Sequence, residues 1–119
     1  MNATKTPSRI NSTARLNDLF RALEEFRKLD PTMPSQTAAI FLYVAVHPGC
    51  TMKDVAEALG TSESSVSRNV SALSDWHRLK RPGLGLVTKD YDPYELRRRI
   101  INLTPKGQRV LNSLSAIME

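Results

Sequence analysis

The chain of 119 residues is 40% hydrophobic and 24% charged, which is ordinary for one globular domain with its own core. No apolar run reaches the roughly 20 residues of a membrane span, and the N-terminus lacks the apolar stretch of a secretory signal. We therefore expect a cytoplasmic protein that does not enter a membrane. Cys50 is the only cysteine, which excludes an intramolecular disulfide. With only His47 and His77 beside it, the chain offers no zinc ligand set, so no metal or cofactor is expected.

The net charge of +5 is spread unevenly. Residues 1–67 carry seven basic and seven acidic residues, whereas residues 68–109 carry ten basic and four acidic ones. All of the excess positive charge therefore lies in one segment of the chain. Charge placed in this way is typical of a protein that binds a polyanion.

The first helical pattern covers residues 12–29. Residues 1–11 are polar, contain Pro7 and have no periodicity, which predicts a disordered tail, with a basic arm through Lys5 and Arg9 as the alternative. An apolar stripe at helical spacing follows, and Asp30-Pro31 ends it. The stripe consists of Leu16, Leu19, Phe20, Leu23 and Phe26.

A second helix is predicted from about Pro34 to Val46. Proline is favoured at the start of a helix, and the segment AAIFLYVAV is apolar nearly all round. We therefore expect this helix at the centre of the core. The residues His47, Pro48 and Gly49 end it.

Residues 51–74 predict two short helices joined by a tight turn. Thr51 is a candidate N-cap with Asp54 three residues later, Gly60 suits the end of the first helix, and Ser62 caps the second. In the second helix an apolar stripe must face inward. It consists of Val66, Val70 and Leu73.

The opposite face of this second helix is rich in small hydroxyl residues. We expect Ser64, Arg68 and Ser71 to point outward, with Ser65 and Ser67 on the flanks. Small hydroxyls allow close approach to DNA, and an arginine can bind guanine or a phosphate. This pattern is typical of a recognition helix, although an αα-hairpin with a solvated serine face is the alternative.

The remaining pattern predicts a β-hairpin and a last helix. Strands are expected over residues 84–90 and 96–103, with a turn around Asp92-Pro93. Thr104-Pro105 begins a helix over residues 105–118, whose stripe includes Leu111 and Leu114. Trp76 is expected to pack on the core, with base stacking as the alternative.

The order helix, helix, helix, recognition helix, hairpin, helix predicts a mainly α fold with a small β-hairpin. This is a winged helix-turn-helix domain over residues 12–119, flanked by N- and C-terminal helices. The segment from Met33 to Leu111 resembles the MarR family of bacterial transcription regulators. The matching stretches are MPSQTAAIFLYVAVHPG, DVAEALGTSESSVSRNVSAL and DPYELRRRIINLTPKGQRVL.

The resemblance implies a dimer that binds double-stranded DNA, with the wing in the minor groove. The family's wing pattern is Asp-x-Arg-Asp-x-Arg, whose first Asp corresponds to Asp92 and whose last Arg corresponds to Arg97. The family pairs these two positions. At the tip, Tyr94 replaces the usual arginine. The chain is short for the family, so the dimer is expected to form through helices 12–29 and 105–118 alone.

We therefore predict a homodimeric, sequence-specific DNA-binding transcription regulator that represses a promoter, and no enzyme. The predicted DNA-binding residues are Ser64, Ser65, Ser67, Arg68, Lys89, Arg97 and Arg98. A solvated, charge-protected strand edge is the alternative for the wing arginines. A winged-helix protein-interaction module and a replication or partition component of a mobile element remain alternative functions. A small-molecule effector and a thiol-sensing role for Cys50 stay open.

Overall fold

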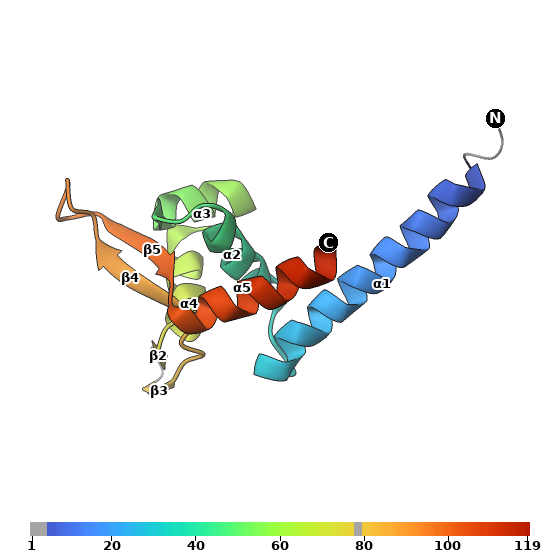
Figure 1. Ribbon diagram of the computed structural model, residues 1–119. Helices are drawn as coiled ribbons and strands as arrows, with labels where there is room; N and C mark the ends of the chain where they lie inside the picture. Colours follow the sequence, from blue (N-terminus) through green and yellow to red (C-terminus); the bar gives the residue numbers. More distant parts are fainter. Residues whose placement is uncertain (1–4, 78–79) are drawn as a thin grey trace.

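The computed structural model describes residues 5–77 and 80–119, apart from the side chains of residues 5–11, 76 and 77. The molecule measures 58 × 29 × 25 Å, and its first helix, α1 (Lys5–Leu29), projects from the rest of the domain on the side away from the wing (Figure 1). Three ion pairs between residues three apart lie along the second half of this helix.

The prediction of a disordered tail over residues 1–11 is wrong for residues 5–11, since α1 begins at Lys5. Residues 1–4 lie outside the described part. Pro7 lies in the first turn of α1 and does not break the helix. Proline is tolerated in the first turn of a helix, because the amide N–H that it lacks would have no intrahelical partner there.

Helix α2 (Ser35–Val46) is central to the core, as predicted. Ile40, Phe41 and Val44 have no exposed surface, and the ring of Phe41 meets that of Phe26 edge to face. Not every apolar side chain of α2 is covered, because Leu42 is 42% and Val46 is 70% exposed in the protomer. One side of α2 faces solvent.

The helix-turn-helix consists of α3 (Met52–Leu59) and α4 (Glu63–Leu73), and its predicted caps are confirmed. The Thr51 hydroxyl accepts a hydrogen bond from the Asp54 amide, and the Asp54 carboxylate accepts one from the Thr51 amide. Gly60 ends α3 in the left-handed conformation at φ 66°, which only glycine adopts without strain. The Ser62 hydroxyl caps α4 by accepting from the Ser65 amide.

The wing is an antiparallel hairpin of β4 (Val87–Tyr91) and β5 (Arg99–Leu103), and β1 (Cys50–Thr51) extends it to a sheet of order β1-β5-β4. Both wing strands are shorter than predicted. Residues 84–86 instead bond to the last turn of α4, where the Leu84 amide donates to the Ala72 carbonyl and the Leu86 amide donates to the Leu73 carbonyl. An unpredicted second hairpin joins β2 (Trp76–His77) to β3 (Arg81–Pro82) directly after α4.

Helix α5 (Pro105–Met118) begins at a tight joint with the wing. The Thr104 hydroxyl accepts from the Gly107 amide and donates to the Gly85 carbonyl at 2.6 Å. A Cβ on Gly107 would lie 2.1 Å from the Leu86 carbonyl oxygen, so this approach requires glycine. From this joint α5 runs back along the C-terminal half of α1 (Figure 1).

Candidate nucleic-acid interface

The outer face of α4 is polar and exposed, while its inner face anchors it to the core. Val66, Val70 and Leu73 have no exposed surface. Ser64, Ser67 and Arg68 are exposed, as predicted. The Ser64 hydroxyl lies 3.3 Å from that of Ser62 at the N-terminus of the helix. Three of the predicted contact residues on α4 therefore lie on a surface that a large ligand can reach.

Ser65 belongs to a hydrogen-bond network that joins α2 to α4. Gln36 donates from Nε2 to the Ser65 hydroxyl at 2.7 Å, and Thr37 donates to Asn69 Oδ1 at 2.6 Å. Asn69 in turn donates to the Ser65 carbonyl. Ser65 is half-buried, and the hydrogen bond that its hydroxyl accepts from Gln36 helps to position α4. Sequence reasoning missed Gln36 and Asn69, since no local pattern connects residues about 30 positions apart.

The prediction that Ser71 points outward is wrong, because Ser71 is only 6% exposed. The chain folds back over the last turn of α4, where the Leu84 amide bonds to the Ala72 carbonyl. Helical periodicity gives the direction of a side chain but not the position of a distant segment that covers it.

The wing tip is held by Asp92, which is 7% exposed. Asp92 Oδ1 accepts from the Tyr94 amide at 2.8 Å, and Oδ2 accepts from Arg98 Nε at 3.0 Å. The Tyr94 amide, followed by the Arg98 guanidinium, holds the pKa of Asp92 below its ordinary value. The family pattern implied that Arg97 pairs with Asp92. The structure corrects this, since Arg98 makes the pair.

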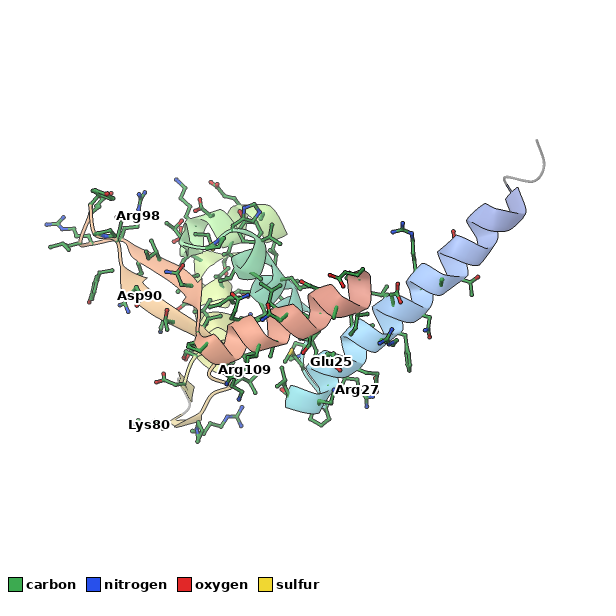
Figure 2. The ribbon with its side chains drawn as sticks, viewed as in Figure 1. Glu25, Arg27, Lys80, Asp90, Arg98 and Arg109 are labelled. Carbon is green, nitrogen blue, oxygen red and sulfur yellow. The ribbon has the colours of Figure 1, made fainter. Side chains whose placement is uncertain are left out.

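The other basic residues of the wing differ in how they are held. The Arg99 guanidinium lies 4.4 Å above the ring of Tyr91 and donates to the Lys89 carbonyl at 3.2 Å. The side chains of Lys89 and Arg97 are exposed and make no ion pair within the described residues. Figure 2 shows Arg98 near the end of the wing and Asp90 nearer its base.

A hollow of about 550 Å³ beside α4 is lined by Arg68 and Arg81, and also by Asn69 and by Asp30 from the turn after α1. Arg81 is not among the DNA-binding residues predicted from the sequence, although the run HRLKR is a visible basic signal. Lys80 lies at the end of the same hairpin (Figure 2). The basic β2–β3 hairpin thus contacts α4 through β2. The prediction for the Trp76 side chain lies outside the described part.

Cys50 lies in β1 at the root of the wing and is 6% exposed. Burial, reinforced by the nearby Asp54 carboxylate, raises the pKa of its thiol to about 11. A thiol at this pKa carries almost no thiolate at neutral pH, which disfavours the sensor interpretation.

Among the described residues, no group of three or more His, Cys, Asp or Glu side chains is placed to hold a metal ion. In the same part of the chain, no helix combines the length and the apolar character that crossing a membrane requires.

Comparison with known proteins places this arrangement in a defined class. Residues 32–77, which span α2 to the end of the helix-turn-helix, match the sequence profile of the MarR family. No sequence in a search of curated proteins matches the chain.

Solved structures extend the likeness beyond that segment. A MarR-like transcriptional regulator from Thermotoga maritima is 26% identical with a TM-score of 0.65, over 99% of this chain and 76% of its own. S. aureus MepR in a complex with DNA is 22% identical with a TM-score of 0.66, over 92% and 73%. The transcriptional repressor CouR bound to a 23-mer DNA duplex is 21% identical with a TM-score of 0.61, over 98% and 75%.

The chain therefore has a winged helix-turn-helix fold that is similar to the folds of solved MarR-type regulators. It resembles the MarR family in the sequence of its helix-turn-helix and in its whole fold. The profile match ends at His77, so the wing and α5 are related to the family through the fold.

Proposed function

We propose that this chain is a cytoplasmic transcription regulator that binds double-stranded DNA sequence-specifically as a homodimer and represses a promoter, with no catalytic activity of its own. The observation that carries the proposal is the exposed face of α4, which bears Ser64, Ser67 and Arg68, in a domain from which a wing with several basic residues also projects (Figure 1). This face lies within the segment that matches the MarR profile. Two of the similar structures, of MepR and CouR, are bound to DNA.

In the proposed complex α4 enters the major groove and the wing contacts the adjacent minor groove. Base edges are contacted by Ser64, Ser67 and Arg68. The Ser65 hydroxyl accepts a hydrogen bond from Gln36 and contacts DNA by donating its own proton. Lys89 and Arg97 contact the DNA backbone. Arg98 lies next to Arg97 in the turn of the wing, where its main role is to pair with Asp92.

The proposed dimer forms through α1 and α5. Four large apolar residues of α1 are 50–65% exposed in the protomer, an unusual exposure for residues at helical spacing. They are Leu16, Leu19, Phe20 and Leu23. A second copy of the chain would bury this stripe and place two α4 helices about one DNA turn apart, roughly 34–36 Å.

Salt-dependent binding to duplex DNA tests the proposal. If the dimer neutralises about five to eight phosphates, log K should fall with log salt at a slope of about −5 to −7. Fluorescence anisotropy on a labelled duplex between low and physiological salt measures this slope. An affinity that does not change with salt would contradict DNA binding and favour a protein-interaction module.

Sedimentation tests the dimer separately. The double variant Leu16→Glu, Phe20→Glu should sediment as a monomer and bind DNA much more weakly, whereas the matched exposed change Asn17→Glu should remain dimeric. A double variant that stays dimeric would place the interface elsewhere.

A further inference from the structure

The turn of the wing exposes two large apolar side chains at the end of a projecting hairpin. Tyr94 is 96% exposed and Leu96 is 73% exposed, and both lie between β4 and β5 at the far end of the wing (Figure 1). Neither residue contributes to the core of the protomer. Apolar groups exposed together on a projecting element commonly mark a binding surface.

The backbone that presents these side chains is already ordered. The Asp92 amide donates to the Arg98 carbonyl at 2.8 Å, and the Arg98 amide donates to the Glu95 carbonyl at 2.9 Å. Asp92 Oδ1 accepts from the Tyr94 amide. Because the turn is closed by its own hydrogen bonds, contact through Tyr94 and Leu96 requires little further ordering of the chain.

The charges around the tip favour a nucleic-acid partner. Arg97 is exposed in the turn and Lys89 is exposed in β4 next to the exposed Asp90, while the charge of Asp92 is compensated by Arg98. Glu95 is the exposed acid of the turn itself. The apolar side chains of the tip thus lie near Lys89 and Arg97, which make no ion pair within the described residues. This combination is complementary to a DNA groove, because the groove has a partly apolar floor and phosphates along its edges.

We infer that the wing tip is an apolar wedge: Tyr94 and Leu96 enter the minor groove and press against a base step, while Arg97 contacts the flanking phosphate. This inference rests on the proposed function. Minor-groove proteins insert apolar side chains between base steps, and pyrimidine–purine steps such as TA and CA unstack at the lowest cost. The wing therefore selects a flexible step beside the sequence that α4 contacts.

Selection from a library of random-sequence duplexes tests the wedge, with wild type, Tyr94→Ala and Tyr94→Arg compared in parallel. Wild type should enrich a core sequence flanked by TA or CA steps. Tyr94→Ala should keep the core, lose the flanking preference and bind the wild-type duplexes about tenfold more weakly for each wing. Tyr94→Arg should replace the flexible step with a narrow A-tract. Melting temperatures should not change, since Tyr94 is almost fully exposed.

A second measurement reports unstacking directly. With 2-aminopurine at the flanking step of an enriched duplex, wild type should raise its fluorescence several-fold, and Tyr94→Ala should not. Equal flanking preference and equal fluorescence for wild type and Tyr94→Ala would overturn the wedge while leaving DNA binding intact. Failure of wild type to enrich any duplex would instead overturn the proposed function, and the wedge with it.

Discussion

Helix α4 and the wing tip both face outward, yet they are held in place by different means. Three residues of α4 with no exposed surface, Val66, Val70 and Leu73, fix the helix to the core, and the α2 network fixes its rotation. The wing tip is held by contacts within the turn itself, namely its backbone hydrogen bonds and the two bonds of the Asp92 carboxylate. The orientation of α4 is thus a property of the whole domain, whereas the conformation of the tip is local. The two regions should therefore respond differently to mutation.

The largest effect is expected from the buried side of α4. Leu73→Ala should lower the free energy of unfolding by about 2–5 kcal/mol, because it leaves a cavity where no surface is exposed. Urea denaturation measures this loss. The matched change on the outer face, Ser67→Ala, should stay within about 0.5 kcal/mol of wild type. Similar losses for both variants would mean that α4 is not anchored through its inner face.

Arg68 and Arg97 should fail in different ways. Arg68→Ala should cost roughly 1–3 kcal/mol of binding on the selected site and little on scrambled duplex, because an arginine on a recognition helix can contact guanine. Arg97→Ala should weaken both duplexes alike and flatten the salt slope by about one unit per site, as expected for a phosphate contact. Titrations of each variant on the selected and the scrambled duplex measure these losses of affinity. The opposite pattern would mean that Arg97 contacts bases and Arg68 contacts phosphates.

The Asp92 contact predicts a local acid transition at the wing tip. Its pKa lies below the ordinary value of 3.8, so the charged form stabilises the folded turn above that pH. As pH falls below 3.8 towards the lowered value, Asp92 takes up a proton and this stabilisation is lost. The protection of the Tyr94 amide, measured as its exchange rate relative to the intrinsic rate at the same pH, should therefore fall over this window while α4 stays protected. Asp92→Asn should lower this protection at every pH, and unchanged protection would contradict the role of Asp92.

The smallest effect at neutral pH is expected from the ionisation of Cys50, which lies at the root of the wing. Because its pKa is raised from 9.0 to about 11, the folded state keeps the thiol proton where the unfolded state has lost it. The stability that Cys50 contributes is thus full below pH 9 and declines between pH 9 and about 11. The difference in unfolding free energy between wild type and Cys50→Ala should shrink over this range. Rapid alkylation of the native thiol at neutral pH would contradict its burial.

Local signals in the sequence predicted much of the fold. Thr51, Gly60, Ser62 and Thr104 act on the backbone within a few residues of themselves, so the caps of α3, α4 and α5 could be found from spacing alone. The apolar stripe of α4 also gave its buried face correctly.

Features that depend on distant parts of the chain could not be predicted in this way. Ser71 is buried by a segment that returns after an unexpected hairpin, and Ser65 is bound by Gln36 from another helix. The family pattern favoured Arg97 as the partner of Asp92. The turn bonds the Asp92 amide to the Arg98 carbonyl, which brings Arg98 instead of Arg97 within reach of the carboxylate.

The joint at Thr104 and Gly107 has a mechanical consequence. The start of α5 touches the Leu86 carbonyl with no side chain between them, and Thr104 bonds to the carbonyl of Gly85. These contacts leave no compressible layer that could absorb a tilt of α5. A rotation of the helix that runs along α1 is therefore transmitted to the root of the wing, as a stiff lever transmits motion through its pivot. In a dimer joined through these helices, the spacing of the two wings would follow the angle between the two protomers.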